Sequence, residues 1–143
     1  MVNNQEQRTW STAISKDGDR AIVFRYVSSF GPNNPKVVQP DRIILAWRFV
    51  SENGLPSTEE CEQMDELEDG LSSLIEMEGF TTLALVSTGE NLREWVFYAK
   101  SEDEFIERLN VVLSGAPIFP IEIHTGRDPD WSTYESFKSR VKS

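Results

Sequence analysis

Residues 41–74 read DRIILAWRFVSENGLPSTEECEQMDELEDGLSSL, a strand pattern followed closely by a helix pattern. In Asp41–Val50 alternate residues are apolar, which places four large side chains on one face of a buried strand: Ile43, Leu45, Trp47 and Phe49. Asn53-Gly54 then breaks the pattern, as expected of a turn. A strand leading into an amphipathic helix is typical of a sheet covered by helices, so this unit decides the fold.

The helix is predicted over Ser57–Glu78, beginning with a capping box formed by Ser57 and Glu60. At 100° per residue, one side of the helix is an apolar stripe: Cys61, Met64, Leu67, Leu71, Leu74 and Ile75. The opposite side carries six carboxylates, which we expect to share one exposed face: Glu59, Glu62, Asp65, Glu66, Asp69 and Glu76.

Beyond this helix the patterns predict, in order, two strands, a second capped helix and a third strand: Phe80–Thr88, Leu92–Lys100, Ser101–Leu113 and Ile118–Thr125. From residue 41 the order is therefore β-α-β-β-α-β, which is the ferredoxin-like pattern of an α+β fold. We expect an antiparallel sheet with both helices on one face. Six residues are predicted to be largely buried: Trp47, Leu71, Leu74, Leu83, Leu85 and Ile121.

The two ends of the chain add a hairpin and a helix to this core. Thr9–Ser15 and Arg20–Ser28 are strand patterns that flank Asp17-Gly18, a hairpin signal. A proline-rich loop runs to Pro40, and a C-terminal helix is predicted to start at Asp128-Pro129. The chain is thus predicted to be one domain, divided as a flexible 1–8, a hairpin and loop 9–40, a ferredoxin-like core 41–125 and a helix 128–142. Because Phe80–Thr88 is apolar on both faces, the hairpin or the last helix is expected to cover the second face.

The charge is strongly negative and unevenly placed. The net charge is −10, yet residues 1–50 carry seven basic and four acidic residues, while residues 51–92 carry eleven acidic residues and no Lys or Arg. Such a chain is expected to be repelled by nucleic acids and by anionic membranes. The acidic helix face is either a solvated surface that keeps the protein soluble or a docking surface for a basic protein.

Location is predicted from what the chain lacks. Cys61 is the one cysteine, so no disulfide can form within the chain, which fits a reducing compartment. The first eight residues contain no apolar signal-peptide region, and no apolar run is long enough to span a membrane. We therefore expect a cytoplasmic protein.

No catalytic, metal or cofactor motif is found. His124 is the one histidine, so a histidine-pair zinc site is excluded. A Cys61–His124 dyad is conceivable, but the neighbouring glutamates work against a thiolate, and Cys61 lies on the apolar stripe. The chain has no phosphate-binding loop, dinucleotide fingerprint or nucleophile elbow. We predict neither a cofactor nor a metal.

Two local segments admit a structural or a functional interpretation. The segment Asp128-Pro-Asp130-Trp131-Ser-Thr-Tyr134 is interpreted either as a helix cap with two core aromatics or as an exposed binding rim formed by Asp128, Asp130, Trp131 and Tyr134. In the strand beginning at Leu92, Trp95 and Phe97 are expected to pack inward, and Arg93 is expected to pair with the acidic helix.

Several of these stretches resemble a known family. Asn53-Gly54-Leu55-Pro56, Leu67-Glu68-Asp69-Gly70-Leu71, Arg93-Glu94-Trp95-Val96-Phe97-Tyr98 and the Asp128–Tyr134 segment occur in the order typical of the domain of unknown function 695. The resemblance spans about residues 10–137 and implies a fold rather than an activity. More remotely, the layout and acidity are similar to those of the regulator of ribonuclease activity B, a non-enzymatic inhibitor that binds a ribonuclease.

These observations lead to one functional hypothesis and two alternatives. The first is a non-catalytic protein-binding or regulatory module that docks a basic partner through the acidic helix face. The alternatives are an enzyme that uses carboxylates alone and a small-molecule or lipid site between the sheet and the C-terminal helix.

Overall fold

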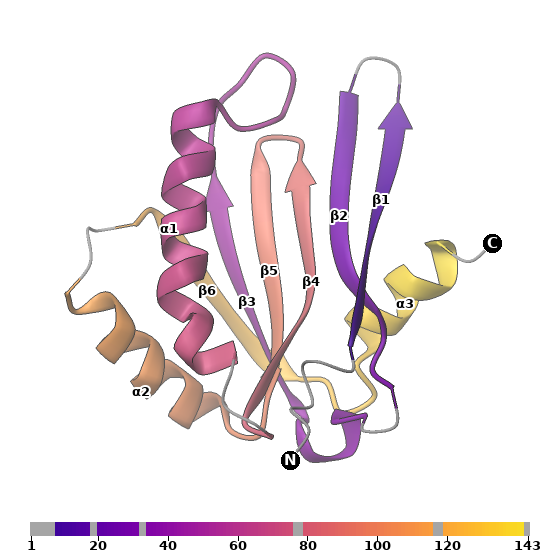
Figure 1. The fold of residues 1–143 in the computed structure, drawn as a ribbon, viewed down its shortest axis with the longest axis vertical. Helices are drawn as coiled ribbons and strands as arrows, with labels where there is room; N and C mark the ends of the chain where they lie inside the picture. Colours follow the sequence, from indigo (N-terminus) through magenta and orange to yellow (C-terminus); the bar gives the residue numbers. More distant parts are fainter. Residues whose placement is uncertain (1–7, 18–19, 32–33, 76–78, 116–118, 142–143) are drawn as a thin grey trace.

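The computed structural model describes residues 8–17, 20–31, 34–75, 79–115 and 119–141. They form an α+β fold, as predicted (Figure 1). The strands are β1 (Thr9–Asp17), β2 (Arg20–Ser29), β3 (Asp41–Arg48), β4 (Thr81–Gly89), β5 (Leu92–Ala99) and β6 (Ile121–Arg127). The helices are α1 (Thr58–Ile75), α2 (Glu102–Leu113) and α3 (Ser132–Val141), with a short 3₁₀ turn η2 (Lys36–Val38).

The sheet is antiparallel and has six strands in the order β1-β2-β4-β5-β3-β6, two more than the core pattern predicted. The hairpin does not cover the second face of the sheet. It extends the sheet, because β2 pairs with β4 from Val23 opposite Thr88 to Tyr26 opposite Leu85. Gly89 permits this approach, since a Cβ there would lie 2.7 Å from the carbonyl oxygen of Ala21.

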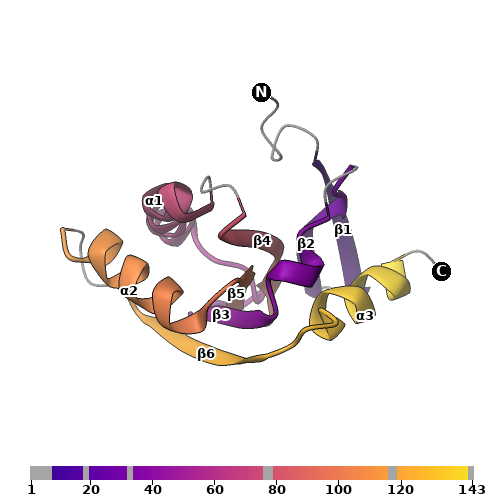
Figure 2. The same cartoon turned by 90° about the horizontal axis from the view of Figure 1, so that it is seen from below.

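The sheet separates two apolar cores. Figure 2 shows α1 and α2 on one face of the sheet and α3 on the other, beside the hairpin. The first core joins α1 and α2 to β3, β4 and β5, and includes Trp47, Leu71, Leu83, Trp95 and Phe105. The second core joins α3 to β2, β4 and β5: Tyr26, Val27, Phe30, Ala84, Leu85, Val96, Tyr98, Trp131, Tyr134 and Phe137. Of the two candidates to cover the second face, the C-terminal helix does so.

Most of the predicted core is confirmed, with one exception at the sheet edge. Trp47, Leu71, Leu74, Leu83 and Leu85 are buried. Ile121 is only half-buried, because β6 is an edge strand with β3 as its one neighbour. The last strand also begins later than predicted, at Ile121, and Ile118 lies outside the described residues.

The helix starts follow capping chemistry. Glu60 N–H donates to Ser57 Oγ over 3.1 Å and Ser57 N–H donates to Glu60 Oε1 over 3.0 Å, which confirms the first capping box. Helix α3 begins at Ser132 rather than at Asp128. The reason is a turn closed by Trp131 N–H on Asp128 O, in which Trp131 has a φ of 54° and is not helical.

Candidate functional site

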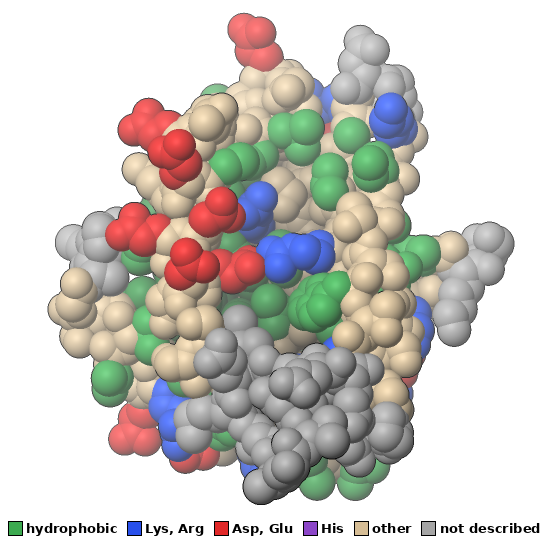
Figure 3. Space-filling view, in the orientation of Figure 1, with side chains coloured by type: hydrophobic (Ala, Val, Ile, Leu, Met, Phe, Trp, Pro, Cys, Tyr) green, Lys and Arg blue, Asp and Glu red, His purple; other side chains and the backbone are tan. Residues whose placement is uncertain are grey.

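The acidic face of α1 consists of the exposed carboxylates Glu59, Glu62, Asp65, Glu66 and Asp69. Acidic side chains line α1 on the side turned to the viewer (Figure 3). Glu76, the sixth predicted member, lies outside the described residues. Within the described ranges, the ion pairs of the molecule involve none of these five. The face is therefore a line of negative charge without a direct ion pair among the described residues, and the charge of Arg93 acts on it only near Asp65.

A second group of polar side chains lies between α1 and the hairpin, and we name it the arginine cluster: Trp10, Arg25, Glu68, Arg93 and Trp95. Figure 3 shows Lys and Arg side chains between the acidic side chains of α1 and the hairpin. Arg25 holds Glu68 with two hydrogen bonds, of 2.6 Å from Nη2 and 3.1 Å from Nη1. Trp95 Nε1 donates to the same carboxylate over 2.9 Å. One carboxylate of α1 is thus tied to both β2 and β5.

Aromatic rings complete the arginine cluster. The guanidinium of Arg25 lies 5.7 Å from the ring centre of Trp10, and that of Arg93 lies 5.8 Å from the ring centre of Trp95. Arg93 Nε donates to Thr88 Oγ1 over 2.8 Å. As expected, Arg93 interacts through its charge with Glu68 and Asp65 of the acidic helix, but among the described residues it makes no direct ion pair with that helix. Arg25 makes that pair, because β2 joins the sheet beside β4 and brings it to Glu68.

The electrostatics of the cluster favour a permanently ionised Glu68. Burial alone raises the pKa of Glu68, but hydrogen bonds from Arg25 and Trp95 and the charges of both arginines outweigh it and leave the pKa below its usual value. Burial also lowers the pKa of Arg93, an effect that Cys61, Glu68 and Asp65 of α1 oppose and that the charge of Arg25 reinforces. The ion pair with Arg25 and the hydrogen bond from Trp95 to Glu68 therefore attach α1 to the sheet.

Replacing Glu68 with Gln is expected to lower the free energy of unfolding by about 1–2 kcal/mol, because the amide cannot accept from Arg25 and Trp95 as a carboxylate does. Urea melts followed by circular dichroism measure the change. Arg48→Gln is a matched control, since its bond to Glu122 joins two exposed side chains on β3 and β6. An equal loss of unfolding free energy in both variants would mean that the contacts of Glu68 stabilise the protein no more than an exposed ion pair does.

The predicted rim is not a rim, because the structure buries three of its four residues. Trp131, Tyr134 and Asp128 are buried, and only Asp130 is exposed. The ring of Trp131 stacks on that of Tyr98 at 4.3 Å, and its Nε1 donates to Gln39 O over 2.8 Å. The hydroxyl of Tyr134 donates to Val27 O. The cap-and-core interpretation of this segment is the correct one, and the expectation of an exposed rim is corrected.

Asp128 is the centre of that cap. Oδ1 accepts from the N–H and hydroxyl of Ser132 over 2.9 and 2.7 Å, and Oδ2 accepts from the hydroxyl of Tyr98 over 2.8 Å and from Thr133 N–H over 3.2 Å. Burial raises the pKa of Asp128, but these hydrogen bonds outweigh it and lower the pKa to about 2. The same carboxylate, together with burial, raises the pKa of Tyr98. Asp128 thus anchors α3 as an ionised group.

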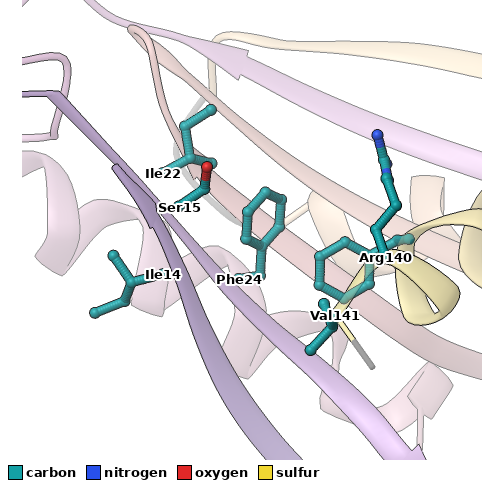
Figure 4. Close-up of a pocket in the computed structure, with 7 residues that line it drawn as sticks. Ile14, Ser15, Ile22, Phe24, Arg140 and Val141 are labelled. Carbon is teal, nitrogen blue, oxygen red and sulfur yellow. The ribbon is translucent and has the colours of Figure 1, made fainter. Parts of the chain in front are cut away.

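A cavity of about 450 Å³ lies between the hairpin and α3, where a pocket between sheet and C-terminal helix was predicted as an alternative. Its lining is mainly apolar: Ile14, Ser15, Ile22, Phe24, Phe137, Arg140 and Val141. Hairpin side chains lie on one side of it and α3 side chains on the other (Figure 4). Its size falls within the range of roughly 300–1,000 Å³ usual for small-molecule sites.

The two residues considered for a dyad are on opposite faces of the sheet. Cys61 belongs to α1, which covers the face that carries Leu45 and Trp95. His124 pairs with Ile44, whose side chain packs against the second core on the other face. His124 instead contacts Glu122 over 3.2 Å at the surface. Among the residues that the structure describes, no three His, Cys, Asp or Glu side chains gather as metal ligands would.

Comparison with known proteins identifies a family. The family model described as a family of unknown function (DUF695) matches residues 8–138. No curated protein and no solved structure matches the chain. Among the described helices, none is long and apolar enough to cross a membrane. The match covers nearly the whole chain, including the sheet, α1, the arginine cluster and the Asp128 cap. The chain therefore belongs to the DUF695 family, whose function is unknown.

Proposed function

We propose that this protein is a non-catalytic binding module that docks a basic protein partner through the acidic face of α1. The observation that supports this proposal best is a set of five exposed carboxylates on one helix face. None of them forms a direct ion pair within the described residues. From Glu59 to Asp69 they extend about 15 Å along the helix axis. A surface of this kind speeds the approach of a partner rich in Lys and Arg.

The helix beneath the face is closely packed and hydrogen-bonded to the sheet, which favours a preformed docking surface. Met64, Leu67 and Leu71 on the opposite side of α1 are fully buried, and Glu68 ties the helix to β2 and β5. The strand order β4-β5-β3-β6 with α1 and α2 on one face supports a ferredoxin-like unit over residues 41–127 as the scaffold. Binding then costs this protein little conformational entropy, because its docking surface is already ordered before the partner arrives.

The carboxylate-based enzyme is less favoured by the charges of the described residues. A carboxylic acid catalyst at neutral pH needs a raised pKa. The three carboxylates whose pKa is clearly shifted, Glu68, Glu122 and Asp128, are all shifted downward. The second candidate function is small-molecule binding in the cavity beside α3, which the cavity volume and its apolar lining favour.

The triple variant Glu62→Lys, Asp65→Lys, Glu66→Lys tests the docking face. We expect it to fold normally and to bind a labelled Lys/Arg-rich peptide about 10-fold more weakly than the wild type at low salt, mainly through slower association. Fluorescence anisotropy and stopped-flow mixing measure both quantities. Binding of the wild type is expected to weaken as salt is raised.

The matched control is Asp103→Lys, Glu107→Lys, Asp130→Lys, which reverses three exposed carboxylates away from α1. It changes the net charge equally, so equal weakening in both variants would reduce the effect to overall charge. Recovery of the same proteins from lysate by the wild type and the α1 variant, together with equal peptide binding, would leave solubility as the role of the face.

A further inference from the structure

Strand β1 is an edge of the sheet with little protection along its middle, since Lys16, Asp17 and the irregular register between Thr9 and Trp10 lie at its two ends. It pairs with β2 alone, and Figure 1 shows it on the outside of the sheet. Edge strands normally carry charges or prolines that prevent another strand from adding. β6, the other edge, contains Glu122, His124 and Arg127. The stretch 9–15 of β1 reads TWSTAIS and contains no charge and no proline, and Trp10 and Ile14 are 40% and 59% exposed.

We propose that β1 pairs with β1 of a second copy of this chain, in antiparallel orientation, so that two six-stranded sheets become one continuous sheet. The sequence of the strand is complementary to itself about Ala13. With a two-fold axis at Ala13, Thr12 lies opposite Ile14, Ser11 opposite Ser15, and Trp10 opposite Lys16. Closed two-fold pairing of this kind is the commonest oligomeric arrangement.

Each of these pairs is favourable or neutral. Thr12 and Ile14 are β-branched residues, which pair well across strands, and the ammonium of Lys16 meets the indole of Trp10. No like charges face one another among the pairs from residue 10 to residue 16. Alternate residues of β1 direct their N–H and C=O groups away from β2, so the pairing adds roughly eight backbone hydrogen bonds.

Charge placement is compatible with a second copy at this edge. Two chains of net charge −10 repel each other, and the eleven acidic residues of residues 51–92 are concentrated on and around α1. Figure 2 shows α1 on the side of the picture opposite to β1. The charged residues of the stretch 8–16 are Arg8 and Lys16, and Asp17 follows at the end of β1, so two β1 strands meet across a middle stretch without negative charge.

The cavity beside α3 opens at the same edge, since Ile14 and Ser15 of β1 are among its lining residues. In the paired arrangement Ser11 and Thr12 of the second copy lie opposite these two residues. The second copy therefore covers exposed apolar surface next to the added strand as well as the backbone edge. This contact is separate from the acidic face of α1, which stays accessible in the dimer.

The test is the mass of the full chain in solution, measured by sedimentation velocity at micromolar concentration. The wild type is expected to be a dimer. Two variants, Thr12→Lys with Ile14→Lys and Thr12→Glu with Ile14→Glu, place like charges opposite each other, and each is expected to weaken dimerisation about 100-fold or more. An equimolar mixture of the two variants is expected to restore the dimer, because Lys then faces Glu at every altered pair.

The control is Ile123→Lys with Thr125→Lys on β6, where both residues are also exposed, and it is expected to remain a dimer. Salt is expected to strengthen the dimer by screening the repulsion between acidic chains, the opposite of its effect on docking at α1. Circular dichroism verifies that each variant is folded. A wild type that stays monomeric, a dimer that only the β6 variant disrupts, or folded variants that do not recover on mixing would each overturn the proposal.

Discussion

Leu71→Ala is expected to lower the free energy of unfolding by about 2–5 kcal/mol. Leu71 is fully buried in the first core, on the side of α1 that faces the sheet. Truncation removes its apolar contacts and leaves a cavity that the strands beneath can fill only in part. Urea melts followed by circular dichroism and tryptophan emission measure the loss, and Trp95 in the same core reports on the local packing.

Gln63→Ala is the control on the same helix, because Gln63 is exposed and its replacement is expected to change stability by less than about 0.5 kcal/mol. A loss below about 1 kcal/mol for Leu71→Ala would contradict the assignment of the buried side of α1. The assignment of the acidic face as the exposed side of α1 would then be wrong as well, because it is the opposite side of the same helix.

Asp128→Asn is expected to lower the free energy of unfolding at pH 7 by about 3–5 kcal/mol. The change removes the charge that caps α3, and it leaves the hydroxyl of Tyr98 and two N–H groups with a weaker acceptor in a buried place. Equilibrium urea melts are the measurement. Asp130→Asn, two residues away and exposed, is expected to have little effect.

The loss for Asp128→Asn is also expected to depend on pH. The pKa of Asp128 is about 2 in the folded protein and 3.8 ordinarily, so its ionisation stabilises the fold above about pH 4 and ceases to do so as the pH falls to 2. That difference of pKa corresponds to about 2 kcal/mol. The gap between wild type and variant should therefore narrow by that amount from pH 5 to pH 2. A constant gap would show that the carboxylate does not act through its charge.

Local patterns predicted the elements well and their pairing less well. The apolar alternation around Leu45 and the capping box at Ser57 are properties of neighbouring residues, and both elements formed where expected. Whether a hairpin adds to a sheet or covers it depends on which strand edge is open. The hydrophobic periodicity of a segment carries no information about that edge. The half-burial of Ile121 has the same origin, since only the final strand order makes β6 an edge.

In the candidate site, too, the features set by local sequence were predicted and those set by strand pairing were not. The acidic face follows from helical spacing alone, and its five described members are exposed as expected. The arginine cluster joins Arg25 to Glu68 across 43 positions and depends on the unexpected pairing of β2 with β4. Trp131 and Tyr134, which the sequence presented either as core aromatics or as part of an exposed rim, are both buried. Their burial settles which of the two interpretations of that segment is correct.

The second core has a consequence for the order in which the molecule is assembled. Its closing contact runs from Tyr134 to Val27, which are 107 positions apart in the chain. The contacts between α1, α2 and the strands that follow them close shorter loops, which cost less entropy and form sooner. A chain emerging from the ribosome therefore displays the apolar face of β2, β4 and β5 until α3 has been translated. During that interval the uncovered apolar surface is of the kind that makes folding intermediates prone to aggregate.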